Sequence, residues 1–448
     1  METRVLIPSG ALGLGYDREA LARGVARGPD IIAIDGGSTD SGPAYLGRGV
    51  SKYSRSSTKS EWRELMQARA QAGVPLLVGT AGTCGSDSAV DWLFEITKEI
   101  AGELDQNLRV ARLFCGQETA ATAQALSDGR LSALEGAPEI DAQILSSCTN
   151  IVALAGAEQI QAALATRADI VIAGRSTDTG VIAALPLAKG AHPGAAWHGA
   201  KVGECGAIAT TEPGSGVIEM VFDETGFTMT PLGETARATP QTVSAHMLYE
   251  NTDPYILYEP GGYLDVREAA YTALDNKRVR VEGSKWVPGA YSVKLEGARI
   301  TGHQVASLAI LRDARYVENS QAWVEDVARQ CREKVVARLG IEDFEIELRR
   351  IGADATLGAL ETQTSTAHEI GVLAIVTAQT EAIAQEIAKM LNPYLLHHPL
   401  VPEEPMPTFA FPFSPPEMSR GPAYAFCLHH VLALSDPMEA FRLEVSDL

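Results

Sequence analysis

The chain has 448 residues and a net charge of −20, with 46% hydrophobic and 21% charged residues. A phosphate backbone needs a basic protein face, so this acidic balance excludes nucleic acid as the main partner. No apolar run approaches the roughly 20 residues of a membrane helix, and the first residues lack the pattern of a signal peptide. We therefore expect a cytoplasmic protein with no membrane partner.

The first half of the sequence alternates short apolar runs with segments of helical periodicity. The expected strands include RVLIPSG, DIIAID, VPLLVG, LRVARLF, NIVALAG and DIVIAG, and helices such as AEQIQAALATR lie between them. In the helix that ends before Gly73, Thr58 and Glu61 have the spacing of a capping box. Apolar strands that alternate with helices are typical of a parallel sheet covered on both faces. Residues 1–215 are therefore predicted to form a doubly wound, mostly parallel α/β domain.

The pattern changes near Pro213. The segment VIEMVFDETGFTMTPL alternates around a central turn and predicts a hairpin. From residue 306 onward, the expected order is strand, helix, strand, strand, helix and strand. Residues 216–448 are therefore predicted to form an α+β domain with a ferredoxin-like arrangement.

A proline-rich arm spans residues 393–422 and contains nine of the 23 prolines, together with Phe409, Phe411 and Phe413. This composition predicts neither a helix nor a central strand. The arm is either a connector that crosses the surface or a segment laid over a neighbouring subunit, because exposed phenylalanines favour cover. We favour the second interpretation and expect a homo-oligomer.

Two similar stretches, DIIAIDGGSTDSG at 30–42 and DIVIAGRSTDTG at 169–180, place Ser-Thr-Asp after a predicted strand. Open parallel sheets bind ligands beyond the carboxyl ends of their strands. We therefore expect the two turns to converge on one site, with Asp40 and Asp178 as acid–base groups and Arg175 as a clamp for a carboxylate. The alternative is that these side chains only cap the helices that follow. The expected substrate-binding groups of the turns are Ser38, Thr39, Arg175, Ser176 and Thr177.

A third strand leads into GTAGTCGSDS, where Thr80, Gly82 and Thr83 are expected to bind substrate. Glycines let the chain turn tightly, and the helix N-terminus that follows, capped by Ser86 or Ser88, attracts an anion. A plain strand-to-helix connection explains the loop equally well. The spacing matches no nucleotide-binding motif.

Two further acid–base candidates are Glu204, in Gly-Glu-Cys-Gly, and His246. Cys205 is either a nucleophile or a buried structural cysteine. The segment SKYSRSSTKS at 51–60 is either a basic lid or a solvated loop.

No metal-ligand pattern is present in the sequence. The six cysteines are scattered without a CxxC pair, which is typical of reduced cytoplasmic thiols and gives no sign of a zinc site, and HExxH is absent. Carboxylates of Asp40, Asp178 and Glu204 can hold a divalent metal, but nothing in their spacing demands one. No residue is therefore assigned as a metal ligand, and the cofactor stays open.

Five stretches resemble the acyclic terpene utilisation (AtuA-like) family: LIPSGALGLGYDREAL, VIAGRSTDTGV, HGAKVGECGAI, HMLYENTDPYILYEPGGYLDV and KRVRVEGSKW. The resemblance runs from the N-terminus to the helix near Trp323. It implies a cytoplasmic bacterial protein that acts in the catabolism of branched or carboxylated carbon skeletons. It supplies no set of catalytic residues.

Three functions are open. The first is a lyase, a hydratase or dehydratase that acts on a small anionic carboxylate or acyl substrate, because that chemistry needs a carboxylate clamp, a base and an acid. The second is a hydrolase of amides, esters or thioesters with Cys84 or Cys205 as nucleophile. The third is a non-catalytic subunit that needs a small partner protein. We rank the lyase first.

Overall fold

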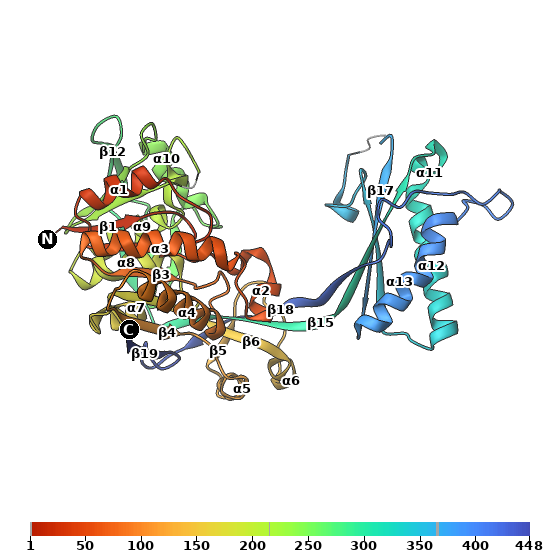
Figure 1. The fold of residues 1–448 in the computed structure, drawn as a ribbon, viewed down its shortest axis with the longest axis horizontal. Coiled ribbons are helices and arrows are strands. Elements are labelled where there is room, and N and C mark those ends of the chain that lie inside the picture. Colours follow the sequence, from red (N-terminus) through yellow and green to blue (C-terminus); the bar gives the residue numbers. More distant parts are fainter. Residues whose placement is uncertain (1, 215, 364–366) are drawn as a thin grey trace. The chain divides into compact units, whose positions relative to one another are not determined.

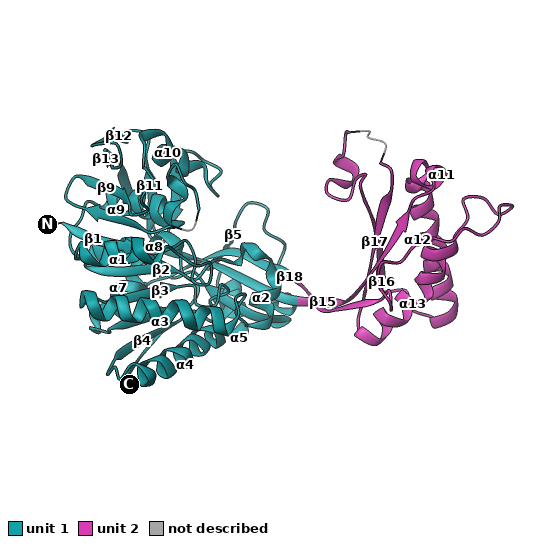
Figure 2. Cartoon of the chain, turned by 45° about the horizontal axis from the view of Figure 1, so that its top comes forward, with its two compact units in different colours: residues 1–299, 426–448 teal, residues 300–425 magenta. Residues whose placement is uncertain are grey.

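The computed structural model describes residues 2–214, 216–363 and 367–448. The chain forms two compact units (Figure 2), and the first is discontinuous in sequence: unit 1 comprises 1–299 and 426–448, and unit 2 comprises 300–425. Both chain ends belong to unit 1. The units therefore divide the chain differently from the expected domains 1–215 and 216–448. No helix in the described ranges is long and apolar enough to cross a membrane.

Unit 1 is built around a ten-stranded mixed sheet (Figure 1). Its parallel centre has the order β1-β2-β3-β7-β4, and antiparallel strands extend both edges. In sheet order the strands are β12 (Ala270–Ala273), β13 (Val279–Glu282), β9 (Gly226–Pro231), β8 (Ile218–Phe222), β1 (Thr3–Ile7), β2 (Ile31–Asp35), β3 (Leu76–Gly79), β7 (Ile170–Ala173), β4 (Arg109–Phe114) and β19 (Arg442–Asp447).

Helices cover both faces of the parallel centre because its strand residues alternate between two cores. In β1, Leu6 faces one core while Val5 and Ile7 face the other. The Leu6 core is closed by α1 (Arg18–Ala26), α3 (Arg55–Ala72) and α4 (Asp87–Glu103). The opposite core is closed by α7 (Ala157–Ala165), α8 (Asp178–Ala188) and α9 (Pro193–Gly203). The mixed α/β class is thus confirmed, whereas the doubly wound arrangement stays a prediction.

Shorter elements of unit 1 complete the fold. The small sheet consists of β10 (Ile256–Glu259), β11 (Gly262–Asp265) and β14 (Lys285–Pro288). The shorter helices are η1 (Thr39–Ser41), α2 (Pro43–Arg48), α5 (Thr119–Ser127), α6 (Ala142–Ser146), η2 (Gly206–Ala209), α10 (Pro240–Ala245) and η3 (His246–Leu248).

A second sheet has the order β16-β17-β15-β18-β5, and β6 also pairs with β15. The long strands β15 (Ser292–Leu311) and β18 (Met418–Ala433) each continue from one unit into the other. Its other strands are β5 (Leu131–Ala133), β6 (Cys148–Ala153), β16 (Phe344–Ile351) and β17 (Ile370–Ala378). Unit 2 adds α11 (Ala314–Glu318), α12 (Ser320–Leu339), η4 (Gly358–Leu360) and α13 (Glu381–His397). The ferredoxin-like assignment of this region stays a prediction.

Two expectations about local structure are wrong. Helix α3 begins at Arg55 with Ser54 as its cap, so Thr58 lies inside the helix and forms no capping box with Glu61. Ser54 lies four residues before Thr58, and its side chain accepts the hydrogen bond from the backbone N–H of Ser57 that caps the helix.

The proline-rich arm is also more regular than expected. Pro393 lies inside α13, and β18 includes Pro422. Pro422 is tolerated because β5 pairs only with 430–432, which leaves this end of β18 free on the β5 side. Phe409 packs against Tyr316 and Trp323 within unit 2, with ring centroids 4.8 and 5.4 Å apart. Its own chain therefore covers Phe409, and the homo-oligomer stays a prediction.

Candidate functional site

A cavity of about 390 Å³ opens at the carboxyl ends of the parallel strands, and all its lining residues belong to unit 1. We call it the site cavity. Its wall is strongly acidic, and Lys52 is the one cation among its described lining residues. The titratable or reactive side chains that line it are Asp35, Asp40, Lys52, Tyr53, Asp178, Cys205, Tyr249 and Glu250.

The two Ser-Thr-Asp turns meet at the site cavity, where both Asp40 and Asp178 line the wall. Burial raises the pKa of Asp178 to about 6, against the lowering effect of Arg175, and the charge of Asp40 raises it further. The turns also cap helices: Ser38 caps η1 and Thr177 caps α8. The capping and convergence interpretations are therefore compatible.

Asp35, the last residue of β2, also lines the cavity. It is not among the site residues predicted from the sequence. Its carboxylate accepts hydrogen bonds from the backbone N–H groups of Gly36 and Gly37 at 2.8 and 3.0 Å. Burial and the charge of Asp178 raise its pKa well above the ordinary value, despite Arg175. The sequence signal for this residue is an aspartate at the end of a predicted strand, directly before Gly36 and Gly37.

Arg175 lies behind the cavity wall, where it binds Glu296 on β15. Its Nε donates to Oε2 at 3.0 Å and its Nη2 to Oε1 at 3.4 Å, and Oε2 also accepts from Thr39 at 2.9 Å. Burial favours a neutral Glu296, but Arg175 and Lys294 outweigh it and hold the pKa at about 2. The role expected for Arg175 as a substrate clamp does not fit this geometry, because an internal carboxylate occupies it. No local pattern identified Glu296.

The loop after β3 packs against the second turn. A Cβ on Gly85 would lie 2.3 Å from the backbone nitrogen of Arg175, so only glycine fits there. Thr80 hydrogen-bonds with Ser176 and is fully buried, and Gly82 accepts a bond from the backbone of Lys52. Of the loop residues expected to bind substrate, Thr83 alone lines the cavity.

Thr83 has two features of a functional position. Its φ of 76° is strained for a β-branched residue. Its Oγ1 is buried and lacks a hydrogen-bond partner in the described ranges. Such strain and an unsatisfied hydroxyl are typical of ligand-binding loops.

Glu204 and His246 adjoin the cavity beside Cys205. Lys201 on α9 lies with its Nζ 2.5 Å from Oε1 of Glu204, and both side chains are buried. Burial raises the pKa of Glu204 to about 8, although Lys201 acts in the opposite direction. Burial lowers the pKa of His246 to about 4, so its imidazole is neutral near pH 7. Its ring stacks on Tyr249 at a centroid distance of 5.1 Å.

A further carboxyl group, Glu259 on β10, adds to this acidic region and was not predicted. Thr179 donates a hydrogen bond to its Oε1, while its Oε2 is buried without a partner in the described part of the chain. Burial raises its pKa to about 7, and the charge of Asp178 contributes in the same direction.

The basic segment 51–60 divides between two structures. Lys52 lines the cavity, and its Nζ donates to Ser41 Oγ at 2.7 Å. Arg55 and Lys59 instead lie in the first turns of α3 and pair with Glu99. The segment is therefore neither a solvated loop along its length nor a separate lid.

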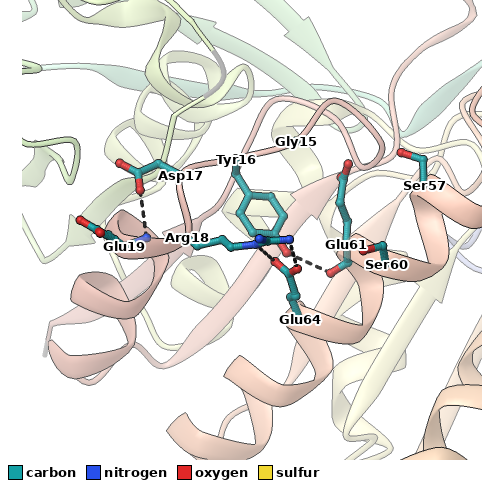
Figure 3. Close-up of a pocket in the computed structure, with 9 residues that line it drawn as sticks. All are labelled: Gly15, Tyr16, Asp17, Arg18, Glu19, Ser57, Ser60, Glu61 and Glu64. Atoms are coloured by element: carbon teal, nitrogen blue, oxygen red, sulfur yellow. Dashed lines mark hydrogen bonds and ion pairs between the residues drawn. The ribbon is translucent and has the colours of Figure 1, made fainter.

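A larger pocket of about 570 Å³ lies between α1 and α3 and shares no lining residue with the site cavity (Figure 3). Arg18 reaches across it and binds Glu64 at 3.0 and 2.6 Å, and Tyr16 donates to the backbone oxygen of Glu61. Because the polar groups of this second pocket already bind one another, we take the site cavity as the candidate functional site.

Comparison with known proteins identifies the family. The model of the acyclic terpene utilisation family protein AtuA matches residues 51–404, which is most of the chain. No curated protein and no solved structure matches the chain. The matched range includes Asp178, Glu204 and His246. The chain therefore belongs to the acyclic terpene utilisation family, which links it to the catabolism of acyclic terpenes.

Proposed function

We propose that the protein is a lyase that adds water to, or removes water from, a small branched carboxylate or acyl substrate in the site cavity. The observation that carries the proposal is that Asp35 and Asp178 line one cavity in environments that both raise their pKa values. Two nearby carboxyl groups that titrate at different pH values can serve as acid and base at the same time.

The pKa values assign the two roles. Near pH 7, Asp178 is mostly ionised and acts as the base that removes the proton next to the substrate carbonyl. Asp35, whose pKa is raised well above the ordinary value, donates a proton to the departing hydroxyl, which leaves as water while the carbon–carbon double bond forms. Hydration follows the same path in reverse. This assignment replaces Glu204 and His246 as the primary acid–base candidates, because neither lines the cavity.

Lys52 replaces Arg175 as the group that binds the substrate carboxylate. It lines the cavity with Ser38, Ser41 and Tyr53, which can donate further hydrogen bonds. The raised pKa of Asp35 favours its neutral form, which lowers the negative charge of the wall that an anionic substrate meets. Leu14, Ile208 and Pro213 supply apolar surface for a branched hydrocarbon portion.

A cysteine hydrolase is less well supported. A nucleophilic cysteine needs a lowered pKa. Burial and the charge of Glu204 instead raise the pKa of Cys205, and Cys84 is buried within the loop after β3.

The test is an incubation of the purified protein with branched 2- and 3-hydroxy acids and α,β-unsaturated acids, free and as thioesters, in heavy water. We expect deuterium at the carbon next to the carbonyl and interconversion of hydroxy and unsaturated forms, detected by NMR and mass spectrometry. Absence of both across the panel would remove the lyase. Retention of a stoichiometric small protein partner in the same preparation would then favour a non-catalytic subunit.

A further inference from the structure

Three side chains with metal-binding atoms meet beside the site cavity, which Cys205 lines. Glu204 ends α9, Cys205 follows it, and His246 begins η3 from a distant part of the sequence. One carboxylate oxygen, the thiol sulfur and one ring nitrogen all lie within 4.8 Å of one another. Small side-chain adjustments bring atoms at this spacing to the roughly 2.0–2.3 Å bonds of a first-row metal.

His246 provides an independent sign of an absent ligand. The residue is 4% exposed, and its Nε2 has no hydrogen-bond partner in the described ranges. Leaving a buried polar atom unsatisfied costs about 1–3 kcal/mol, so such atoms are rare. Stacking on Tyr249 fixes the ring, so an ion held by Nε2 would satisfy the atom without moving it far.

The chemistry of the three donor atoms indicates which class of metal ion they would bind. Sulfur, nitrogen and oxygen donors together suit Zn²⁺ and similar borderline ions, whereas Mg²⁺ and Ca²⁺ prefer oxygen alone. Lys201 occupies Oε1 of Glu204 and leaves the second carboxylate oxygen for an ion. The nearby charges of Asp178 and Glu250, which both act on Cys205, favour a cation despite Lys201.

We propose that Glu204, Cys205 and His246 bind one divalent transition-metal ion of the zinc class at the wall of the site cavity. The thiol of Cys205 releases its proton to water as the metal–sulfur bond forms. Three protein ligands leave a coordination position open, as in catalytic zinc sites. Because Cys205 lines the cavity, the ion would lie where it can meet a ligand in the cavity. Metal binding does not depend on the reaction proposed above.

The test uses the full chain, stripped with a chelator and titrated with Co²⁺ as a spectroscopic probe, with Zn²⁺ as competitor. We expect one Co²⁺ per chain, a thiolate-to-cobalt charge-transfer band, and displacement by Zn²⁺. Cys205→Ser should abolish the band, and His246→Gln should weaken binding by about tenfold or more. Cys331→Ser, on α12 of unit 2, is the matched cysteine control and should keep the band. Circular dichroism checks that each variant is folded.

A second measurement needs no variant. Zn²⁺ should slow alkylation of Cys205 in the wild-type chain, as read by peptide mass spectrometry. The proposal would be overturned if the wild-type chain bound the ion no more tightly than Cys205→Ser and His246→Gln do. It would also be overturned if the charge-transfer band survived in Cys205→Ser, or if Zn²⁺ left the alkylation of Cys205 unchanged. Asp178→Asn removes a nearby charge but no ligand, so it should keep the charge-transfer band, with weaker binding, even where it loses turnover, and failure of the metal site and failure of the lyase are distinguishable.

Discussion

Asp35 and Asp178 line the same cavity, where burial and the negative charge of Asp178 raise the pKa of the Asp35 carboxyl well above its ordinary value. Asp35 is the last residue of β2, and Asp178 is the first residue of α8, which follows β7. Because the carboxyl ends of parallel strands share one edge of the sheet, the fold brings together two acids that are far apart in sequence.

Removal of either acid should slow turnover strongly without unfolding the chain. General acid–base groups contribute about 10²–10⁴-fold to rate, so Asp35→Asn and Asp178→Asn are each expected to lower kcat within that range. The measurement is the rate of deuterium incorporation into one chosen substrate. Asp128→Asn, on an exposed position after α5, is the matched control and should retain the wild-type rate. Normal rates in both cavity variants would exclude the proposed pair.

The pH dependence should report the base. The pKa of Asp178 is raised to about 6, so the fraction in the basic form grows as the pH rises through that value. We expect kcat/KM to rise from pH 5 to pH 7 as Asp178 ionises. A profile that is flat across pH 5–7 while the protein stays folded would contradict the assignment of Asp178.

The raised pKa of Asp178 also has a consequence for stability. An acid whose pKa is higher in the folded than in the unfolded state makes folding less favourable once it ionises. This cost is absent below the ordinary value near 3.8 and complete above about 6. Asp178→Asn should therefore stabilise the protein by about 1–3 kcal/mol at pH 8 and by little at pH 4.

Urea unfolding at the two pH values measures this difference in the free energy of unfolding. Asp128→Asn again serves as control and should show no such dependence. If Asp178→Asn instead lowered the free energy of unfolding at pH 8, the ionised Asp178 would stabilise the fold, which would contradict this account.

The internal pair of Arg175 and Glu296 should be structural. Arg175→Met leaves the buried Glu296 carboxylate with only Lys294 and the Thr39 hydroxyl beside it, removes the 3.7 Å ion pair with Asp178, and is expected to cost about 3–5 kcal/mol. The double variant Arg175→Met with Glu296→Met should recover much of that loss. Lys98→Met breaks the exposed pair with Glu95 and should change stability by only about 0–1 kcal/mol. Equal effects of the two single variants in urea unfolding would contradict this account.

Local sequence pattern predicted the strands and helices that depend on near neighbours. The hairpin of β8 and β9, the long helix α12 and the Ser86 cap of α4 all follow from periodicity and local hydrogen bonding. Pairings over long sequence distances were not predictable in this way. The return of β19 to pair with β4, and of β6 to pair with β15, depends on the tertiary arrangement.

The candidate site was predictable to a similar degree. Repetition of Ser-Thr-Asp identified Asp40 and Asp178, because both copies follow a buried strand. It could not show that Glu296 on β15 would bind Arg175, and this contact removes the guanidinium from the cavity wall. It also could not show that His246 approaches Glu204 and Cys205, since that proximity arises from the packing of η3 near α9.

The most direct test of the acid–base pair is a ¹³C NMR titration of the chain with labelled aspartate carboxyl carbons, assigned with Asp35→Asn and Asp178→Asn. We expect the signal of Asp178 to titrate at about pH 6 and that of Asp35 to titrate well above the ordinary aspartate value. Titration of both signals near the ordinary aspartate value of about 3.9 would contradict the account.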